Sequence, residues 1–357
     1  MKNRSILNSR IFKISRIYAF LIVLWAFPAI AFSQEKGGAD DAKQYDPKDA
    51  IFEHIGDSHS WHTFGHHSFP LPVILYTKQG LDVFMSDKLA EGSIYHGKNN
   101  YILVKDKIKI ADGAGNVDEK QMVLDFSITR NVASMWMGMI ILIIIFSSVS
   151  SSYKKREGKA PKGLQSFLEP VVLFVRDDVA IPNIGNKYYK YMALLLTIFF
   201  FILINNLLGL IPFFPGGFNL TGNISVTLTL AFIVLIVVNF SANKYYWKHI
   251  FLPEIPFWLY IIMIPVELIG IISKPFALMI RLFANITAGH IIVLSLISLI
   301  FIFHSLWMSP VSIVFVVFMD TIELLVAFLQ AYIFTMLTAL FIGMAVEEHH
   351  HHEAAEL

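Results

Sequence analysis

An apolar stretch near the C-terminal end of the chain decides the fold. Residues 256–303 read PFWLYIIMIPVELIGIISKPFALMIRLFANITAGHIIVLSLISLIFIF. One helix of about 48 residues would be roughly 70 Å long, whereas the hydrocarbon core of a bilayer is about 30 Å thick. The next apolar stretch, Pro310–Val346, would be roughly 55 Å long. Neither stretch fits an upright transmembrane helix.

Two arrangements relieve this mismatch. Each stretch breaks into shorter helices, with Pro265 and Pro275 as the candidate break points. Alternatively, the two stretches form one long hairpin that lies strongly tilted, because the ordinary tilt of about 20° is too small. We favour the hairpin, because one crossing per stretch preserves the topology that the loop charges predict.

The composition places the whole chain in the membrane class. Of 357 residues, 55% are hydrophobic and only 15% are charged, and the mean hydropathy is +0.60. A net charge of +1 excludes a strongly basic nucleic-acid binder. The absence of cysteine excludes disulfides, cysteine-ligated zinc, iron–sulfur clusters and thiol nucleophiles. No phosphate-binding GxxxxGK[ST] loop occurs.

The N-terminal residues 1–33 have the pattern of a secretory signal peptide. A basic start precedes the apolar segment Tyr18–Ala31, and the small residues Ala31 and Ser33 have the spacing of a cleavage site. The alternative is an uncleaved first span. The apolar segment is shorter than the roughly 20 residues that a span needs, which favours cleavage.

Residues 34–131 are predicted to form a small exported domain with some β-structure. Short runs of strand-forming residues alternate with Gly, Asn and Asp breakers. These runs are Val73–Tyr76, Tyr101–Val104 and Lys107–Ile110.

Five histidines crowd the first half of this domain. They are His54, His59, His62, His66 and His67. Such a cluster binds a divalent metal, senses pH, or is simply a polar surface. We favour the polar surface, because the nearby Glu53 and Asp57 fix no ligand geometry. No metal or other cofactor is therefore predicted.

Residues 132–346 are predicted to form an all-α transmembrane domain with about five spans. Lys and Arg are concentrated in the loops 150–190 and 243–254, and are absent from 212–222 and 304–309. The positive-inside rule makes the basic loops cytoplasmic. The tail 347–357 then lies in the cytoplasm, and the exported domain lies in the periplasm beyond an inner membrane. The first three spans are Val132–Val149, Tyr191–Ile211 and Ile224–Phe240.

The two long stretches also carry ionisable residues inside apolar sequence. Each charge at mid-bilayer costs at least about 2.5–3.5 kcal/mol, so these side chains must face protein or water. The function predicted by default is an ion or proton path, and the alternative is a set of buried structural ion pairs. The residues are Glu267, Lys274, Arg281 and His290, then Asp320 and Glu323, with the amide of Gln330.

Helical spacing sorts the residues of the first stretch. At 100° per residue, Lys274, Arg281 and Asn285 fall within about 80° of one another, together with Glu267. His290 falls on the opposite face. In the second stretch, Glu323 and Gln330 are seven residues apart and share a face.

The residue types then predict a gated proton path. Arg281 cannot deprotonate, so it cannot relay a proton, but it attracts a carboxylate and favours its ionised form. His290 and Glu323 can both relay protons. This design needs a moving carboxylate, and none is evident in this chain, so a partner subunit is implied.

At these residues the chain resembles subunit a of F-type ATP synthases. The main match is KPFALMIRLFANITAGH at 274–290, with an Arg-Leu-Phe-x-Asn-x-x-Ala-Gly core. Further matches are NLLGLIP at 206–212, TGNISVTL at 221–228 and LQAYIF at 329–334. Together they extend over about 130–345.

The resemblance implies a role for each polar residue. The family's essential arginine corresponds to Arg281, which faces the carboxylate of a rotating c-subunit ring. Two offset half-channels lead protons to and from that ring. His290 and Glu323 correspond to the relay on the periplasmic side, in the His-then-Glu order of mitochondrial members. The remaining correspondences are Asn285 and Gln330 near the arginine, and Glu267 and Lys274 near the cytoplasmic half-channel.

The resemblance also implies the partners and the chemistry. The chain would be a stator subunit beside the subunit b stalk, within the lipid bilayer. It would not be an enzyme on its own, because ATP chemistry belongs to other subunits. The relay residues suit protons better than sodium ions.

Three features depart from the family pattern. The exported domain exceeds the short N-terminus of many members. Some relatives carry an acidic residue after the position of Leu208, where this chain has Gly209. The His-rich tail after Glu347 resembles a purification tag, but we expect it to be native because it has only four histidines and continues to Leu357.

Two other functions fit parts of the sequence. One is a secondary cation transporter that uses the exported histidines for capture, although no internal repeat is evident. The other is a structural membrane scaffold, which leaves Arg281 and Glu323 without a purpose. Co-purification with a ring of small two-helix proteins distinguishes the proton-path subunit from both.

Overall fold

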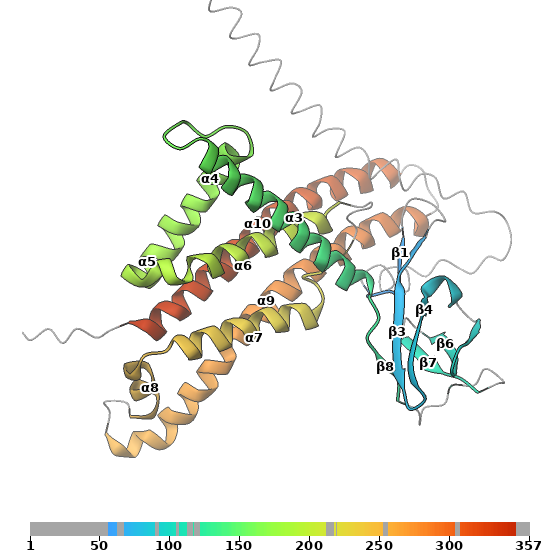
Figure 1. Ribbon diagram of the computed structural model, residues 1–357, viewed down its shortest axis with the longest axis horizontal. Coiled ribbons are helices and arrows are strands. Elements are labelled where there is room, and N and C mark those ends of the chain that lie inside the picture. Colours follow the sequence, from blue (N-terminus) through green and yellow to red (C-terminus); the bar gives the residue numbers. More distant parts are fainter. Residues whose placement is uncertain are drawn as a thin grey trace, which may run out of the picture.

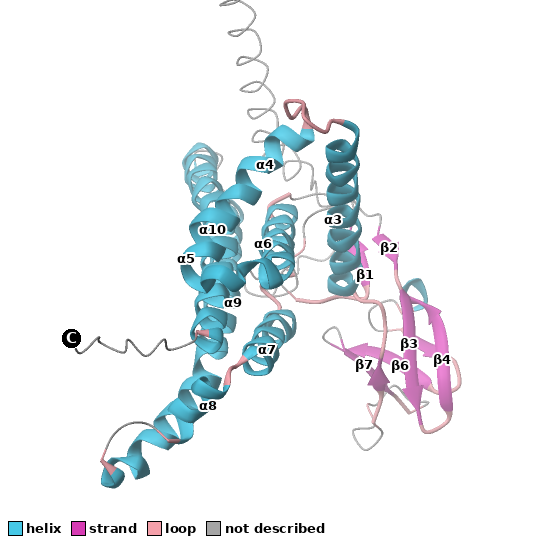
Figure 2. Ribbon diagram, turned by 60° about the vertical axis from the view of Figure 1, so that its left-hand side comes forward, coloured by secondary structure: helices cyan, strands magenta, loops and turns pink. Residues whose placement is uncertain are grey.

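The computed structural model joins a small β-rich unit to a larger helical part (Figure 1), and the strands and the helices occupy separate regions (Figure 2). It describes residues 56–62, 68–89, 93–104, 107–112, 117, 122–211, 218, 220–252, 256–303 and 308–347. The expected signal peptide and most of the C-terminal tail lie outside these residues.

The helical part contains five helical segments that are long and apolar enough to cross a membrane. This finding confirms the predicted all-α membrane protein with about five spans. The crossing helices are α3 (Arg130–Lys155), α6 (Tyr188–Gly209), α7 (Ile224–Ser241), α9 (Tyr260–Phe303) and α10 (Met308–Val346).

The long stretches are unbroken helices. α9 has 44 residues and runs through both Pro265 and Pro275, so the alternative of a break at these prolines is not realised and the favoured unbroken stretch is found. Proline is tolerated within membrane helices where neighbouring groups satisfy the freed backbone. At about 66 Å, α9 far exceeds the bilayer core. α10 has 39 residues and packs along α9, as the hairpin arrangement requires (Figure 1).

The segment expected as a basic loop is largely helical. It contains α4 (Leu164–Phe174), a π-helical turn, Val175–Ala180, and α5 (Ile181–Ile184), which lead on to α6. A further short helix, α8 (Lys244–Phe251), follows α7. Short 3₁₀ turns occupy Ser86–Lys88, Gly185–Lys187 and Phe257–Leu259.

The core of the helical part surrounds α6. Fully buried side chains of α6, α9 and α10 meet there, including Phe199, Ile202, Leu278, Leu282 and Ile342. Small residues allow close helix contact, which is the usual way membrane helices pack. A Cβ atom at Gly343 of α10 would overlap the backbone oxygen of Asn183 in α5.

The β-rich unit confirms the predicted strands. Two three-stranded antiparallel sheets have the strand orders β4-β3-β8 and β5-β6-β7, and β1 pairs with β2 in a hairpin. Their shared core contains Val73, Leu75, Phe84 and Tyr101. The strands are β1 (Ser60–His62), β2 (Ser68–Pro70), β3 (Pro72–Thr77), β4 (Gly80–Met85), β5 (Ile94–His96), β6 (Asn100–Val104), β7 (Lys107–Ile110) and β8 (Leu124–Asp125).

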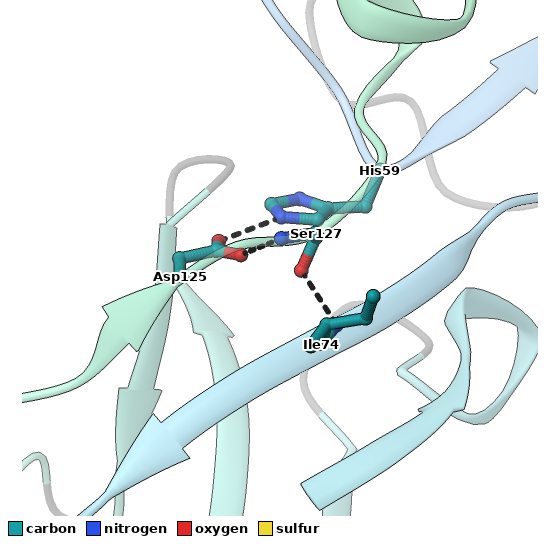
Figure 3. A network of polar contacts seen from close by, with 4 residues as sticks. All are labelled: His59, Ile74, Asp125 and Ser127. Carbon is teal, nitrogen blue, oxygen red and sulfur yellow. Dashed lines mark hydrogen bonds and ion pairs between the residues drawn. The ribbon is translucent and has the colours of Figure 1, made fainter. Parts of the chain in front are cut away.

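A polar network ties β8 to the segment before β1 (Figure 3). The Nε2 atom of His59 lies 2.9 Å from Oδ2 of Asp125, and the backbone N–H of Ser127 donates to the same carboxylate. The Ser127 hydroxyl accepts a hydrogen bond from the Ile74 backbone. Burial raises the pKa of the Asp125 carboxyl, but the hydrogen bonds from His59 and Ser127 outweigh this effect and hold it below the usual 3.8.

We expect Asp125→Asn to destabilise the β-rich unit above pH 3.8 and to have less effect below it. Because the folded pKa is lowered, the carboxylate stabilises the fold above its unfolded pKa, and this stability is lost as the pH falls through the folded pKa. The expected loss is about 1 kcal/mol. Hydrogen exchange of β3 and β8 in the full chain in nanodiscs measures it at pH 7 and pH 3. Exchange at pH 7 equal to that of the exposed control Asp87→Asn would contradict the prediction.

We expect Gly343→Ala to destabilise the subunit by about 1–3 kcal/mol, because the new methyl group forces α10 away from Asn183. The matched control is Gly270→Ala in α9, where an added Cβ meets nothing within 4 Å. The measurement is thermal unfolding of the detergent-solubilised subunit. Equal melting temperatures for the two variants would show that the crossing of α5 and α10 tolerates a methyl group.

Candidate functional site

Arg281 lies on the outward surface of α9. Its neighbours Leu278 and Leu282 are buried in the core, whereas Arg281 and Asn285, one turn later, are exposed. No hydrogen bond or ion pair links Arg281 to any residue that the structure describes. A permanent cation is therefore presented to whatever lies beside α9 in the membrane.

His290 and Glu323 meet on the other side of α9. The Nδ1 atom of His290 lies 2.5 Å from Oε1 of Glu323 on α10, and the side chains are only 18% and 8% exposed. The two atoms have the separation of an ion pair without the angles of a hydrogen bond. Gly289 makes room for the contact, since a Cβ there would lie 3.1 Å from Oε1 of Glu323.

A small polar cavity adjoins this pair, with space for about one water molecule. Asn206 of α6 closes one side, where its Nδ2 donates to the Ala327 backbone oxygen at 3.3 Å. The Thr221 hydroxyl donates to Oδ1 of Asn206 at 2.6 Å. Polar groups from three segments of the chain therefore surround the histidine and the carboxylate.

The Phe218 backbone oxygen and the His290 imidazole lie close to Gly209. A Cβ atom at this position would lie 2.9 Å from the Phe218 backbone oxygen and 4.0 Å from Nε2 of His290. The imidazole thus comes close to the place where an acidic side chain would begin. A larger residue at position 209 would have to displace the backbone at Phe218.

Two further polar residues of α10 flank Glu323. Asp320, one turn earlier, is half-buried and close enough to interact electrostatically with Glu323 and His290. Gln330, two turns later, is buried. The three lie within about 15 Å along one helix.

A second cavity lies between α7, α8, α9 and α10. Lys274 lines it together with Asn239 and Tyr246. The Nζ atom of Lys274 lies 5.8 Å from the centre of the Phe341 ring, a cation–π distance. Burial raises the pKa of the Tyr246 phenol, and the carboxylate of Glu267 raises it further, so Glu267 lies within electrostatic reach of this cavity.

The two cavities are offset along α9, with Arg281 between them. Lys274 precedes Arg281 by seven residues and His290 follows it by nine, which correspond to about 10 Å and about 14 Å of helix.

The shared helix face predicted for Lys274, Arg281 and Asn285 is only partly found. Arg281 and Asn285 share the outward face, whereas the long side chain of Lys274 reaches the Phe341 ring of α10.

The five N-terminal histidines do not form one described cluster. His59 pairs with Asp125, and the side chain of His62 in β1 is not described. His54, His66 and His67 lie outside the described residues. In the part of the chain that is described, no three His, Asp or Glu side chains come together as a metal would require.

Sequence reasoning missed several residues that line the two cavities. Asn206, Thr221, Asn239 and Tyr246 were not among the predicted site residues. A usable signal existed for the amides, because Asn206 and Asn239 interrupt apolar spans and a polar group there needs a partner. No comparable signal pointed to Tyr246, since its role depends on the fold of α8 onto α9.

The two parts of the chain match different families. Residues 132–343 match the family described as ATP synthase A chain, and residues 50–126 match a domain of unknown function (DUF8433). "ATP synthase subunit a" of Chloroherpeton thalassium is 49% identical over 237 residues, which is 65% of this chain and 70% of the relative.

Two further relatives carry a similar name. "ATP synthase subunit a 2" of Chlorobaculum tepidum is 49% identical over 241 residues, covering 65% of this chain and 67% of the relative. "ATP synthase subunit a" of an Anaeromyxobacter species is 39% identical over 239 residues, covering 64% and 57%. This chain therefore belongs to the ATP synthase A chain family, as a subunit a of an F-type ATP synthase.

Proposed function

We propose that this subunit provides two proton half-channels to a rotating c-subunit ring, with Arg281 facing the ring carboxylate. The observation that carries the proposal is the exposed guanidinium in the middle of an apolar helix, without a partner among the described residues. Against lipid, this charge would cost at least about 2.5–3.5 kcal/mol. A carboxylate on a neighbouring subunit removes that cost.

The outer half-channel is assigned to the cavity beside His290 and Glu323. The His290 imidazole and the Glu323 carboxylate lie 2.5 Å apart, and both kinds of side chain can take up and release a proton. Asn206 and Thr221 hold polar atoms that orient a water beside the pair. A proton entering from outside can therefore pass through this pair toward the ring.

The inner half-channel is assigned to the cavity of Lys274, Asn239 and Tyr246, with Glu267 near it. A ring carboxylate that arrives protonated through the lipid releases its proton here. Arg281 then favours its ionised form and keeps the two cavities from exchanging protons directly, because guanidinium neither gives nor takes a proton. Net flux then requires the ring to turn.

We also propose how the chain is oriented in the membrane and which subunits it contacts. The β-rich unit lies in the periplasm and the C-terminus in the cytoplasm, supported by the basic residues between α3 and α6 and in α8. The partners are the c-subunit ring and the subunit b stalk, and other subunits carry the ATP chemistry. Residues 1–33 are a signal peptide. The family match leaves the secondary-transporter alternative without support.

We expect Arg281→Ala to abolish ATP-driven proton pumping. Without the fixed cation, the ring carboxylate loses its counter-ion and protons cross without rotation. The measurement is acidification of inverted membrane vesicles at matched assembly, repeated at several sodium concentrations. The control is Arg176→Ala, because Arg176 is exposed and ion-paired to Asp177 away from both cavities. Coupled pumping by the Arg281 variant, or pumping that requires sodium, would refute the proposal.

We expect His290→Ala and Glu323→Gln each to slow proton flux by about 10²-fold, within the range of lost acid–base groups. Because the two side chains act as one relay, the double variant should be no slower than either single one. Passive proton flux through reconstituted complexes measures all three. Glu169→Gln in α4, outside both cavities, serves as the carboxylate control. Losses that multiply in the double variant would mean that the residues work independently.

A further inference from the structure

The segment that carries β1 is fastened to the outer end of α3. The backbone N–H of Arg130 donates to the Ser58 oxygen at 2.9 Å, and the guanidinium donates to the Gly56 oxygen at 2.5 Å. The N–H of Asn131 donates to the Asp57 carboxylate, an acid at a helix N-terminus. His59 is held by Asp125. The chain just before Trp61 therefore has a fixed position relative to the membrane helices.

Trp61 inserts from this segment into a cluster built by the membrane part. Its side chain is 6% exposed, and its ring meets the Phe218 ring edge-on at 6.0 Å between centroids. Leu220 completes the buried centre of the cluster. Partly buried residues of α3, α6 and α7 surround it, namely Ala133, Met135, Met137, Phe201, Leu208 and Val226.

Phe218 belongs both to this cluster and to the lining of the polar cavity. It is 1% exposed and lines the cavity together with His290 and Glu323. A Cβ atom at Gly209 would lie 2.9 Å from its backbone oxygen, so there is little room for Phe218 to move toward α6. The indole of Trp61 therefore packs against a residue of the cavity wall.

We propose that Trp61 is a positioning residue for proton entry, which holds Phe218 against the cavity and restricts the access of outside water to His290 and Glu323. This inference rests on the proposed outer half-channel. Water reaches the relay along the polar side, marked by Thr221 and Asn206, whereas the apolar side stays dry. The exported unit, which matches a domain of unknown function, thereby becomes part of the wall of the proton path.

The absence of cysteine from the chain makes a direct test available. A reporter thiol is introduced by Ala327→Cys, at a residue that lines the cavity and is 1% exposed. Silver ion travels through aqueous paths. It is added to sealed vesicles that hold the assembled complex, on the side of the membrane that carries the β-rich unit. The remaining free thiol of the isolated subunit is then counted with a maleimide dye, so the readout does not depend on pumping.

We expect Trp61→Ala to accelerate the silver reaction at least about tenfold, since removing a packed indole weakens closure by more than the roughly 1.4 kcal/mol that tenfold represents. Trp61→Phe should restore a rate within about twofold of the parent, because a ring still supports Phe218. Trp136→Ala, which removes a half-exposed indole of α3, is the matched control and should leave the rate unchanged.

Each outcome bears on one of the two proposals. Equal rates in the parent and in Trp61→Ala would overturn the role of Trp61 and leave the outer half-channel intact. Acceleration by Trp136→Ala as well would show general loosening of the outer end and would also overturn it. A thiol at position 327 that reacts in none of the proteins would contradict the outer half-channel itself, and with it this inference.

Discussion

The cost of placing charge in the hydrocarbon core shapes this protein more than any other constraint. A charged side chain there is tolerated only against protein, water or an opposite charge. His290 and Glu323 satisfy the rule within the chain, because each is the neighbour of the other. Lys274 satisfies it with a cavity and an aromatic face. Arg281 has no such neighbour among the described residues, which is why the proposed function places another subunit against α9.

α9 carries the residues that this constraint affects most. Lys274, Arg281 and His290 span about 24 Å on one helix of 44 residues. That span fits within the bilayer core of about 30 Å, so both cavities and the arginine can lie along a single crossing. α9 packs against α10 and lines both cavities, with Arg281 between the two in sequence. Their separation is then a property of one helix pair rather than of loops.

Patterns that depend on neighbouring residues were predictable, and contacts between distant segments were not. Hydropathy and charge predicted the five spans, the single long hairpin and the strands at Val73, Tyr101 and Lys107. The family resemblance led to Arg281 and to the relay pair of His290 and Glu323, which lie 33 positions apart. The joining of Thr221 to Asn206, the approach of Gly343 to Asn183 and the docking of Trp61 on Phe218 each depend on how separate helices cross. No local periodicity encodes such crossings.

Different interactions stabilise the packing of the membrane helices and the docking of the β-rich unit onto them. Within the bilayer, burying apolar side chains brings little gain, so α9 and α10 rely on close contact at small residues such as Gly289, Ala327 and Ala331. At the N-terminal end of α3, beside the β-rich unit, a large aromatic ring is buried instead, that of Trp61. The hydrogen bond from the Asn131 N–H to the Asp57 carboxylate also fixes how the segment before β1 is oriented on α3, which apolar contact alone does not do. The β-rich unit therefore docks on the helical part through a buried aromatic ring together with directed hydrogen bonds to the start of α3.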